Sequence, residues 1–149
     1  MILLDVNVLV YAYREEAPEH SAYARWLREA VKADELCGIN DVVLSAMIRI
    51  TTNPRIFRTP APLDGVLEFA DALRGQPSVI SVDPGPRHWP IFTRTCERAG
   101  AKGNLVPDAW LAALTLESGG ELITADRGFS RFADLRWRHP LTPEAGSGR

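Results

Sequence analysis

Short apolar runs alternate along the chain with longer segments of helical periodicity. Residues 2–10 form an apolar run broken only by Asp5 and Asn7, and short runs of this kind are typical of a strand buried in a parallel sheet. A charged residue inside such a run is costly unless it lies at the strand end and faces a site. We therefore expect Asp5 to follow the first strand. The pattern predicts further strands at 79–82 and 121–124, and an edge strand at 135–137.

Five other segments have apolar residues three or four positions apart, the spacing of a helix with one buried face. The predicted helices cover approximately 19–32, 41–51, 63–73, 86–98 and 107–118. Asn40 suits the N-cap of the second helix, and Gly119 suits the end of the last. Because strands alternate with helices, we expect an α/β fold with a parallel sheet covered on both faces. A single domain is expected over 1–141, followed by a polar, disordered tail at 142–149.

Length and composition fit a globular domain, since 46% of the 149 residues are hydrophobic and 24% are charged. No segment approaches the ~20 consecutive apolar residues of a membrane span. The first residues lack the basic lead and the cleavage site of a signal peptide, so we expect a cytoplasmic protein. Cys37 and Cys96 have no partner at metal-ligand spacing, which favours two free thiols over a zinc site.

The net charge of −2 does not by itself indicate nucleic-acid binding. Of the 17 basic residues, however, 15 are arginines, and the guanidinium group recognises phosphate well. Two basic groups cluster along the sequence: Arg49, Arg55 and Arg58, and then Arg87, Arg94, Arg98 and Lys102. Each group could line a groove, or could equally form a solvated helix face.

Three aspartates occupy positions where an α/β sheet builds its sites. Asp5 follows the first strand, Asp126 follows the strand at 121–124, and Asp108 lies in the first turn of the last helix. The topology can bring all three to one sheet edge, where their repulsion requires a cation. Oxygen ligands suit Mg²⁺ or Mn²⁺ rather than zinc. Water activated by such an ion can hydrolyse a phosphodiester.

Each of these residues also has a purely structural interpretation. Asp108 could be a helix-start carboxylate and Asp126 a turn residue, whereas Asp5 interrupts an apolar strand and is harder to explain in this way. Asn7 could form a local turn or hydrogen-bond the metal-binding carboxylate. Thr124 could be a β-branched strand residue, or its hydroxyl could position water or phosphate.

At these residues the sequence resembles the PIN-domain family, and most of all the VapC-type toxins of type II toxin–antitoxin pairs. The resemblance is carried by the segments LLDVNVLVYA at 3–12, RITTNPRIF at 49–57, NLVPDAWLAAL at 104–114 and LITADRGF at 122–129. It implies a PIN-like three-layer sandwich, with a central parallel sheet flanked by helices, over residues 1–141. It also implies a metal-dependent endoribonuclease that leaves a 5′-phosphate and a 3′-hydroxyl, a homodimer, and a cognate VapB-type antitoxin that blocks the site.

Two positions depart from the family pattern. Many relatives carry a glutamate where this chain has Ala46, and a further acid where it has Gly128. Asp41 is five residues before Ala46 and points well away from it on an ideal helix. One metal ion is therefore expected rather than two.

Three functions are compatible with these residues. The main hypothesis is hydrolysis of RNA by a metal-activated water. A second is a phosphatase of the haloacid-dehalogenase type with Asp5 as nucleophile, although that chemistry normally needs a second aspartate where Asn7 stands. A third is a PIN module that binds RNA or protein without turnover, for which Ala46 and Gly128 are the supporting departures.

Overall fold

The computed structural model describes residues 1–142. Those residues form a parallel sheet of five strands, six α-helices and one 3-10 helix. The elements are β1 (Ile2–Leu4), α1 (Val6–Tyr13), α2 (His20–Ala30), β2 (Cys37–Ile39), α3 (Asp41–Thr51), α4 (Leu63–Arg74), β3 (Val79–Ser81), α5 (His88–Ala99), α6 (Leu105–Ser118), β4 (Glu121–Ile123), η1 (Arg127–Arg131) and β5 (Trp137–Arg138). The tail predicted at 142–149 lies, from residue 143 onwards, outside the described residues.

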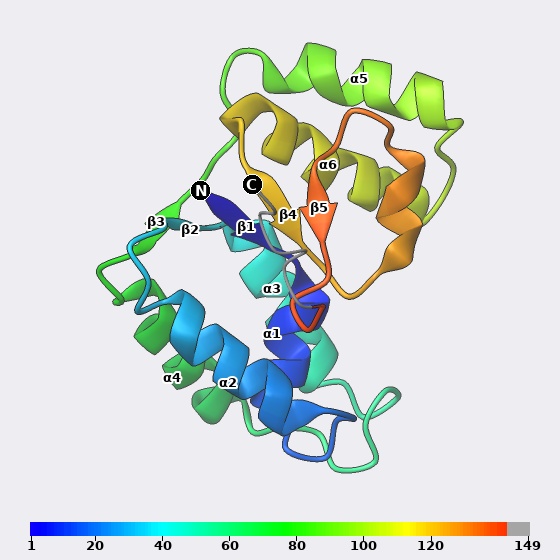
Figure 1. The fold of residues 1–149 in the computed structure, drawn as a ribbon. Coiled ribbons are helices and arrows are strands. Elements are labelled where there is room, and N and C mark those ends of the chain that lie inside the picture. Colours follow the sequence, from blue (N-terminus) through cyan, green and yellow to red (C-terminus); the bar gives the residue numbers. More distant parts are fainter. Residues whose placement is uncertain (143–149) are drawn as a thin grey trace.

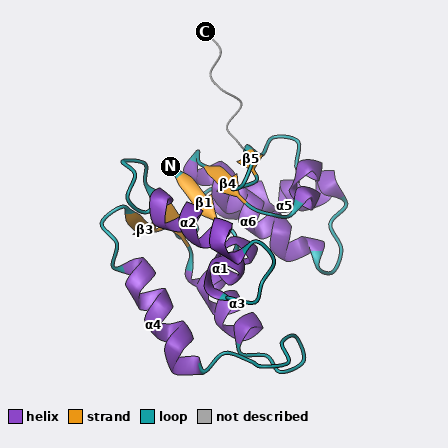
Figure 2. Cartoon of the chain, turned by 60° about the horizontal axis from the view of Figure 1, so that its bottom comes forward, coloured by secondary structure: helices purple, strands orange, loops and turns teal. Residues whose placement is uncertain are grey.

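The sheet has the strand order β3-β2-β1-β4-β5, with β1 in the centre. Helices α1 to α4 gather on one side of the sheet, and α5 and α6 pack together on the other (Figure 1). Figure 2 shows how short the strands are beside the helices that enclose them. The predicted three-layer α/β architecture is confirmed. No helix within residues 1–142 is long and apolar enough to cross a membrane.

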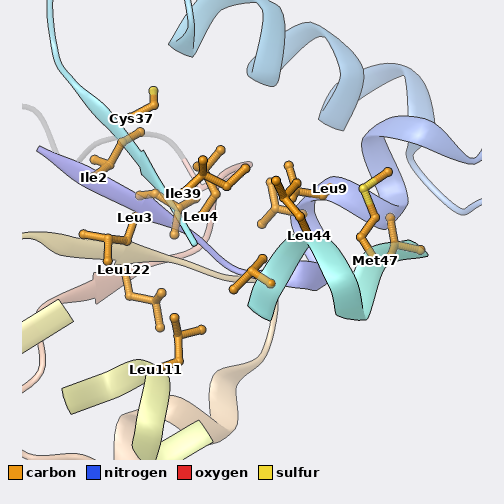
Figure 3. Packing of buried hydrophobic residues seen from close by; sticks show 14 of the residues in the cluster. Ile2, Leu3, Leu4, Leu9, Cys37, Ile39, Leu44, Met47, Leu111 and Leu122 are labelled. Carbon is orange, nitrogen blue, oxygen red and sulfur yellow. The ribbon is translucent and has the colours of Figure 1, made fainter. Parts of the chain in front are cut away.

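The core lies on both faces of β1 and its neighbours. On one face, Leu3 and Leu122 point toward Leu111 of α6, and on the other Leu9 of α1 lies close to Met47 of α3 (Figure 3). All five side chains are buried. Burial of such a side chain contributes about 1.5–3 kcal/mol, so this packing fixes the strand ends on which the polar residues stand.

Asp5 follows the first strand as expected, but the part of the apolar run at 2–10 that comes after it is helical and not extended. The strand ends at Leu4, and α1 begins at Val6 because the Asp5 side chain accepts a hydrogen bond from the Val6 backbone N–H. An aspartate in this N-cap position satisfies a donor that the first turn leaves free. The helix then buries Val8 and Leu9 completely.

Strand β2 was missed by the sequence analysis because it has three residues and a central glycine. A Cβ at Gly38 would lie 2.7 Å from Val82 Cγ2 and 3.2 Å from Leu3 Cγ, so the strands pack too closely there for a side chain. The edge strand is Trp137–Arg138, slightly later than predicted. The five predicted helices are all present, and Asn40 caps α3 by accepting from the Val42 N–H.

Candidate active site

Asp5 stands at the carboxyl end of the central strand and is almost fully buried, with 6% of the residue exposed. Both carboxylate oxygens accept hydrogen bonds. Oδ1 accepts from the Val6 N–H at 2.7 Å, and Oδ2 accepts from the Thr124 hydroxyl at 2.7 Å and the Asn7 amide at 3.0 Å. Burial raises the pKa of Asp5, the bonds from Thr124 and Val6 oppose the rise, and the charge of Asp126 adds to it.

Asn7 and Thr124 join the ends of β1 and β4. Asn7 Nδ2 also donates to the Thr124 hydroxyl oxygen at 3.1 Å, and its Oδ1 accepts from the Ala125 N–H at 3.0 Å. The Asp126 N–H donates to the same hydroxyl oxygen at 3.0 Å. Thr124 is fully buried and donates its hydroxyl hydrogen to Asp5. Both residues therefore act on the site by holding Asp5.

Asp126 follows β4 and is exposed to solvent. Its Oδ1 accepts from the Gly128 N–H at 2.7 Å, which caps η1. A Cβ at Gly128 would lie 2.9 Å from that oxygen, so a side chain there would displace the Asp126 carboxylate. Gly128 therefore contributes to the position of Asp126 both through its backbone N–H and through its lack of a side chain.

Asp108 lies in the first turn of α6 and is half-buried. Its carboxylate accepts no hydrogen bond and forms no ion pair with any other residue of 1–142. Burial, and then the negative charges of Asp5 and Asp126, raise its pKa to about 6, while the charge of Arg131 opposes the rise. An ionised carboxylate in these surroundings is only partly compensated by the charge of Arg131.

The donor set fits a hydrated hard cation. Within residues 1–142, no three acidic, histidine or cysteine side chains form a group that could hold one ion directly, and the assignment of the ion to Asp5, Asp108 and Asp126 stays a prediction. The aspartates nevertheless share one electrostatic neighbourhood, because the charge of Asp126 raises the pKa of Asp5 and the charges of both raise the pKa of Asp108. Mg²⁺ keeps several waters and usually takes only one or two carboxylates, which suits this arrangement.

A family model for the PIN domain matches residues 2–135. The chain belongs to the PIN-domain family. Ribonuclease VapC43 of Mycobacterium tuberculosis is 43% identical to it over 141 residues, which are 95% of this chain and 96% of the relative. Ribonuclease VapC25 of the same species is 37% identical over 140 residues, 94% of this chain and 99% of the relative.

The fold of this PIN domain is shared with solved structures. VapBC-1 from nontypeable Haemophilus influenzae aligns with a TM-score of 0.67 at 18% identity, covering 95% of this chain and 100% of the other. The resemblance to the PIN-domain family stated from the sequence is therefore confirmed, together with the fold that it implied.

The structure shows whether Asp41 could take the place of the glutamate that many relatives carry where this chain has Ala46. Ala46 lies on α3, and Asp41, at the start of that helix, forms an exposed ion pair with Arg74 of α4. Asp41 is not among the charges that shift the pKa of Asp5 or Asp108. The acid missing at Ala46 is thus not replaced by Asp41.

Arg131 is a charged neighbour of the site that the sequence analysis did not single out. It ends η1, and its positive charge lowers the pKa of Asp108. Its position five residues after Asp126 carries no recognisable motif.

Proposed function

We propose that this PIN domain is a divalent-metal-dependent endoribonuclease that acts as the toxin of a toxin–antitoxin pair. The observation that carries the proposal is the half-buried Asp108 carboxylate, which has no hydrogen-bond partner within residues 1–142 and lies in the field of two other carboxylates. Such a group needs a cation. The identity of 43% to a VapC ribonuclease over most of both chains supports RNA as the substrate.

We assign Asp5, Asp108 and Asp126 as the groups that hold Mg²⁺ or Mn²⁺, directly or through water. When bound, the ion supplies a water of lowered pKa and neutralises charge at the phosphate. Asn7 and Thr124 hold Asp5 in one orientation by hydrogen bonds of 3.0 Å and 2.7 Å. Because both Asp5 oxygens accept hydrogen bonds and residue 7 is not an acid, an aspartyl-phosphate mechanism is disfavoured.

Cleavage of RNA by purified protein with Mn²⁺ tests this function. We expect wild type to cut RNA into fragments with 5′-phosphate ends, and Asp5→Asn to lose activity by about a hundredfold or more. The substitution keeps the shape of the side chain, so circular dichroism should remain that of the folded protein. Equal cleavage by the two proteins, or cleavage that persists in EDTA, would rule out this mechanism. Intact RNA with retained RNA binding would instead indicate the non-catalytic module.

We also propose an antitoxin of the VapB type as partner, a homodimer, and action in the cytoplasm. The similarity of fold to VapBC-1 supports the first. Exposed apolar side chains such as Trp89, which is 69% exposed, and Leu63 are compatible with further interfaces. Light scattering of the purified chain measures the oligomer. Co-expression with the cognate VapB-type antitoxin should abolish the RNA cleavage.

A further inference from the structure

A cavity of about 420 Å³ lies between α5, α6 and the segment that follows Asp126. Ile91, Leu116 and Phe132 form apolar parts of its lining, and Arg94, Arg98 and Arg131 contribute the basic groups. A volume of this size is in the range of small-ligand sites, which combine apolar walls with a few polar groups.

The cavity is positively charged although the chain as a whole is not. Its lining holds three arginines and one acid, Asp134, and so carries a net charge of +2, against −2 for the chain. Arg98 pairs with Asp134 at 2.7 Å. The Arg94 guanidinium forms no hydrogen bond or ion pair with any residue of 1–142, and Arg131 Nε donates to the Gly128 carbonyl at 3.1 Å. Two guanidinium groups therefore keep donors for an anion.

Arg131 connects this cavity to the candidate active site. It lines the cavity, and its charge is also felt by Asp108. A second basic groove, with Arg28 and Lys32 between α2 and α4, lies where those helices lead into β2 and β3. That is the amino-terminal edge of the sheet, whereas Asp5 stands at the carboxyl-terminal edge.

We propose that the cavity binds one nucleotide of the RNA strand next to the cleaved bond, which rests on the proposed ribonuclease function. Arg94 and Arg131 take the phosphate, since guanidinium groups match phosphate geometry. Ile91 and Leu116 contact the unstacked base, the form in which single-stranded RNA is usually recognised. The site thereby orients the strand across Asp108.

Binding of a fluorescein-labelled single-stranded RNA of mixed sequence, measured by anisotropy in EDTA, tests the phosphate contact. Arg94→Gln should bind about tenfold more weakly at low salt. When the logarithm of the binding constant is plotted against the logarithm of the salt concentration, the slope for Arg94→Gln should be smaller in magnitude than that for wild type by about 0.7. That is the contribution of one phosphate contact in single strands. The matched control is Arg25→Gln, an exposed arginine on α2, which should bind as wild type does. Equal binding by the two variants overturns the proposal.

The base contact is tested by filling the cavity. Ala133 is exposed and lines it, so Ala133→Trp places an indole there while all three arginines stay. We expect weaker RNA binding than with Ser21→Trp, an equivalent change at an exposed position on α2. If Ala133→Trp binds RNA like wild type, no base enters the cavity and the proposal fails.

Both measurements are made without a divalent metal and do not depend on turnover. RNA that is bound through Arg94 but never cut would contradict the ribonuclease function and support the cavity as an RNA site. Normal cleavage with unchanged binding by Arg94→Gln would remove this inference alone.

Discussion

The Asp108 carboxylate lies in surroundings that disfavour its negative charge. Burial and the charges of Asp5 and Asp126 raise its pKa from 3.8 to about 6. A folded-state pKa above the unfolded value means that ionisation of Asp108 weakens the fold. Stability from this group is complete below pH 3.8 and is lost as the pH rises through about 6. In the metal-free protein, the ionised form that the proposed metal binding needs is therefore the less stable one.

Asp108→Asn should stabilise the metal-free protein at neutral pH, because the amide cannot ionise. The Tm gap between variant and wild type should be absent below pH 3.8, should grow between 3.8 and about 6, and should then stay constant. Thermal melts in EDTA across this pH range measure it. Asp34→Asn, at an exposed loop position, is the control. If the Tm gap did not change with pH, or if Asp108→Asn were less stable than wild type, burial and the charges of Asp5 and Asp126 would not be what destabilises the ionised Asp108.

At the residue scale, the sequence singled out Asp5, Asp108 and Asp126 as a prediction, because the ends of parallel strands and helix starts are where such sites form. It could not show that Arg131 shares their electrostatic field. That field depends on tertiary distances across the turn after β4, and no spacing rule encodes them.

Glu117 ties the turn before α5 to the end of α6. Its carboxylate accepts from the Gly85 N–H at 2.8 Å and from the Arg87 N–H at 3.0 Å. The bond from Gly85, helped by that from Arg87 and by nearby positive charge, lowers the pKa of Glu117. A Cβ at Gly85 would lie 2.6 Å from the carboxylate, so the glycine makes this approach possible. The orientation of α5, and of Arg94 on it, depends on this turn.

Glu117→Gln should lower the Tm at pH 7, since a neutral amide accepts these two hydrogen bonds less strongly than a carboxylate does. Because the pKa of Glu117 is lower in the folded protein than its ordinary value of 4.5, the ionised carboxylate stabilises the fold above pH 4.5. This stabilisation is lost as the pH falls through the lowered pKa of the folded protein. The deficit of the variant should thus disappear in acid. Glu97→Gln, an exposed position on α5, should show no deficit at either pH. A deficit of Glu117→Gln that is equal at pH 7 and in acid would contradict the role of the charge.

Elements were predicted well where their pattern was long. The helices of 11 to 14 residues from α2 to α6 have clear periodicity or stops. The segment of α1 is rich in valine, which is typical of strands, and only the Asp5 cap and burial of Leu9 on the sheet make it helical. Three residues of β2 carry too little pattern to be recognised.

For the whole molecule, the alternation of strands and helices predicted the fold class but not the strand order. The order β3-β2-β1-β4-β5 places β4 beside β1, although the paired Leu3 and Leu122 are 119 positions apart in the chain. Packing of Leu3 and Leu122 on α6 selects this arrangement (Figure 3). It also brings Asp5 and Thr124 together, so the site exists only in the complete fold.

Because the site forms only on folding, a divalent ion should stabilise the whole molecule. Saturation at a hundredfold excess over Kd contributes about 2.7 kcal/mol, which for a domain of 149 residues raises the Tm by about 5–10 °C. Melts with Mn²⁺ or Mg²⁺, against NaCl of equal ionic strength, measure this shift. Asp34→Asn should keep it, whereas Asp5→Asn and Asp108→Asn should lose most of it, since each removes a charge that attracts the ion. An equal shift in wild type and both site variants would mean that the ion binds elsewhere and that these carboxylates do not hold it.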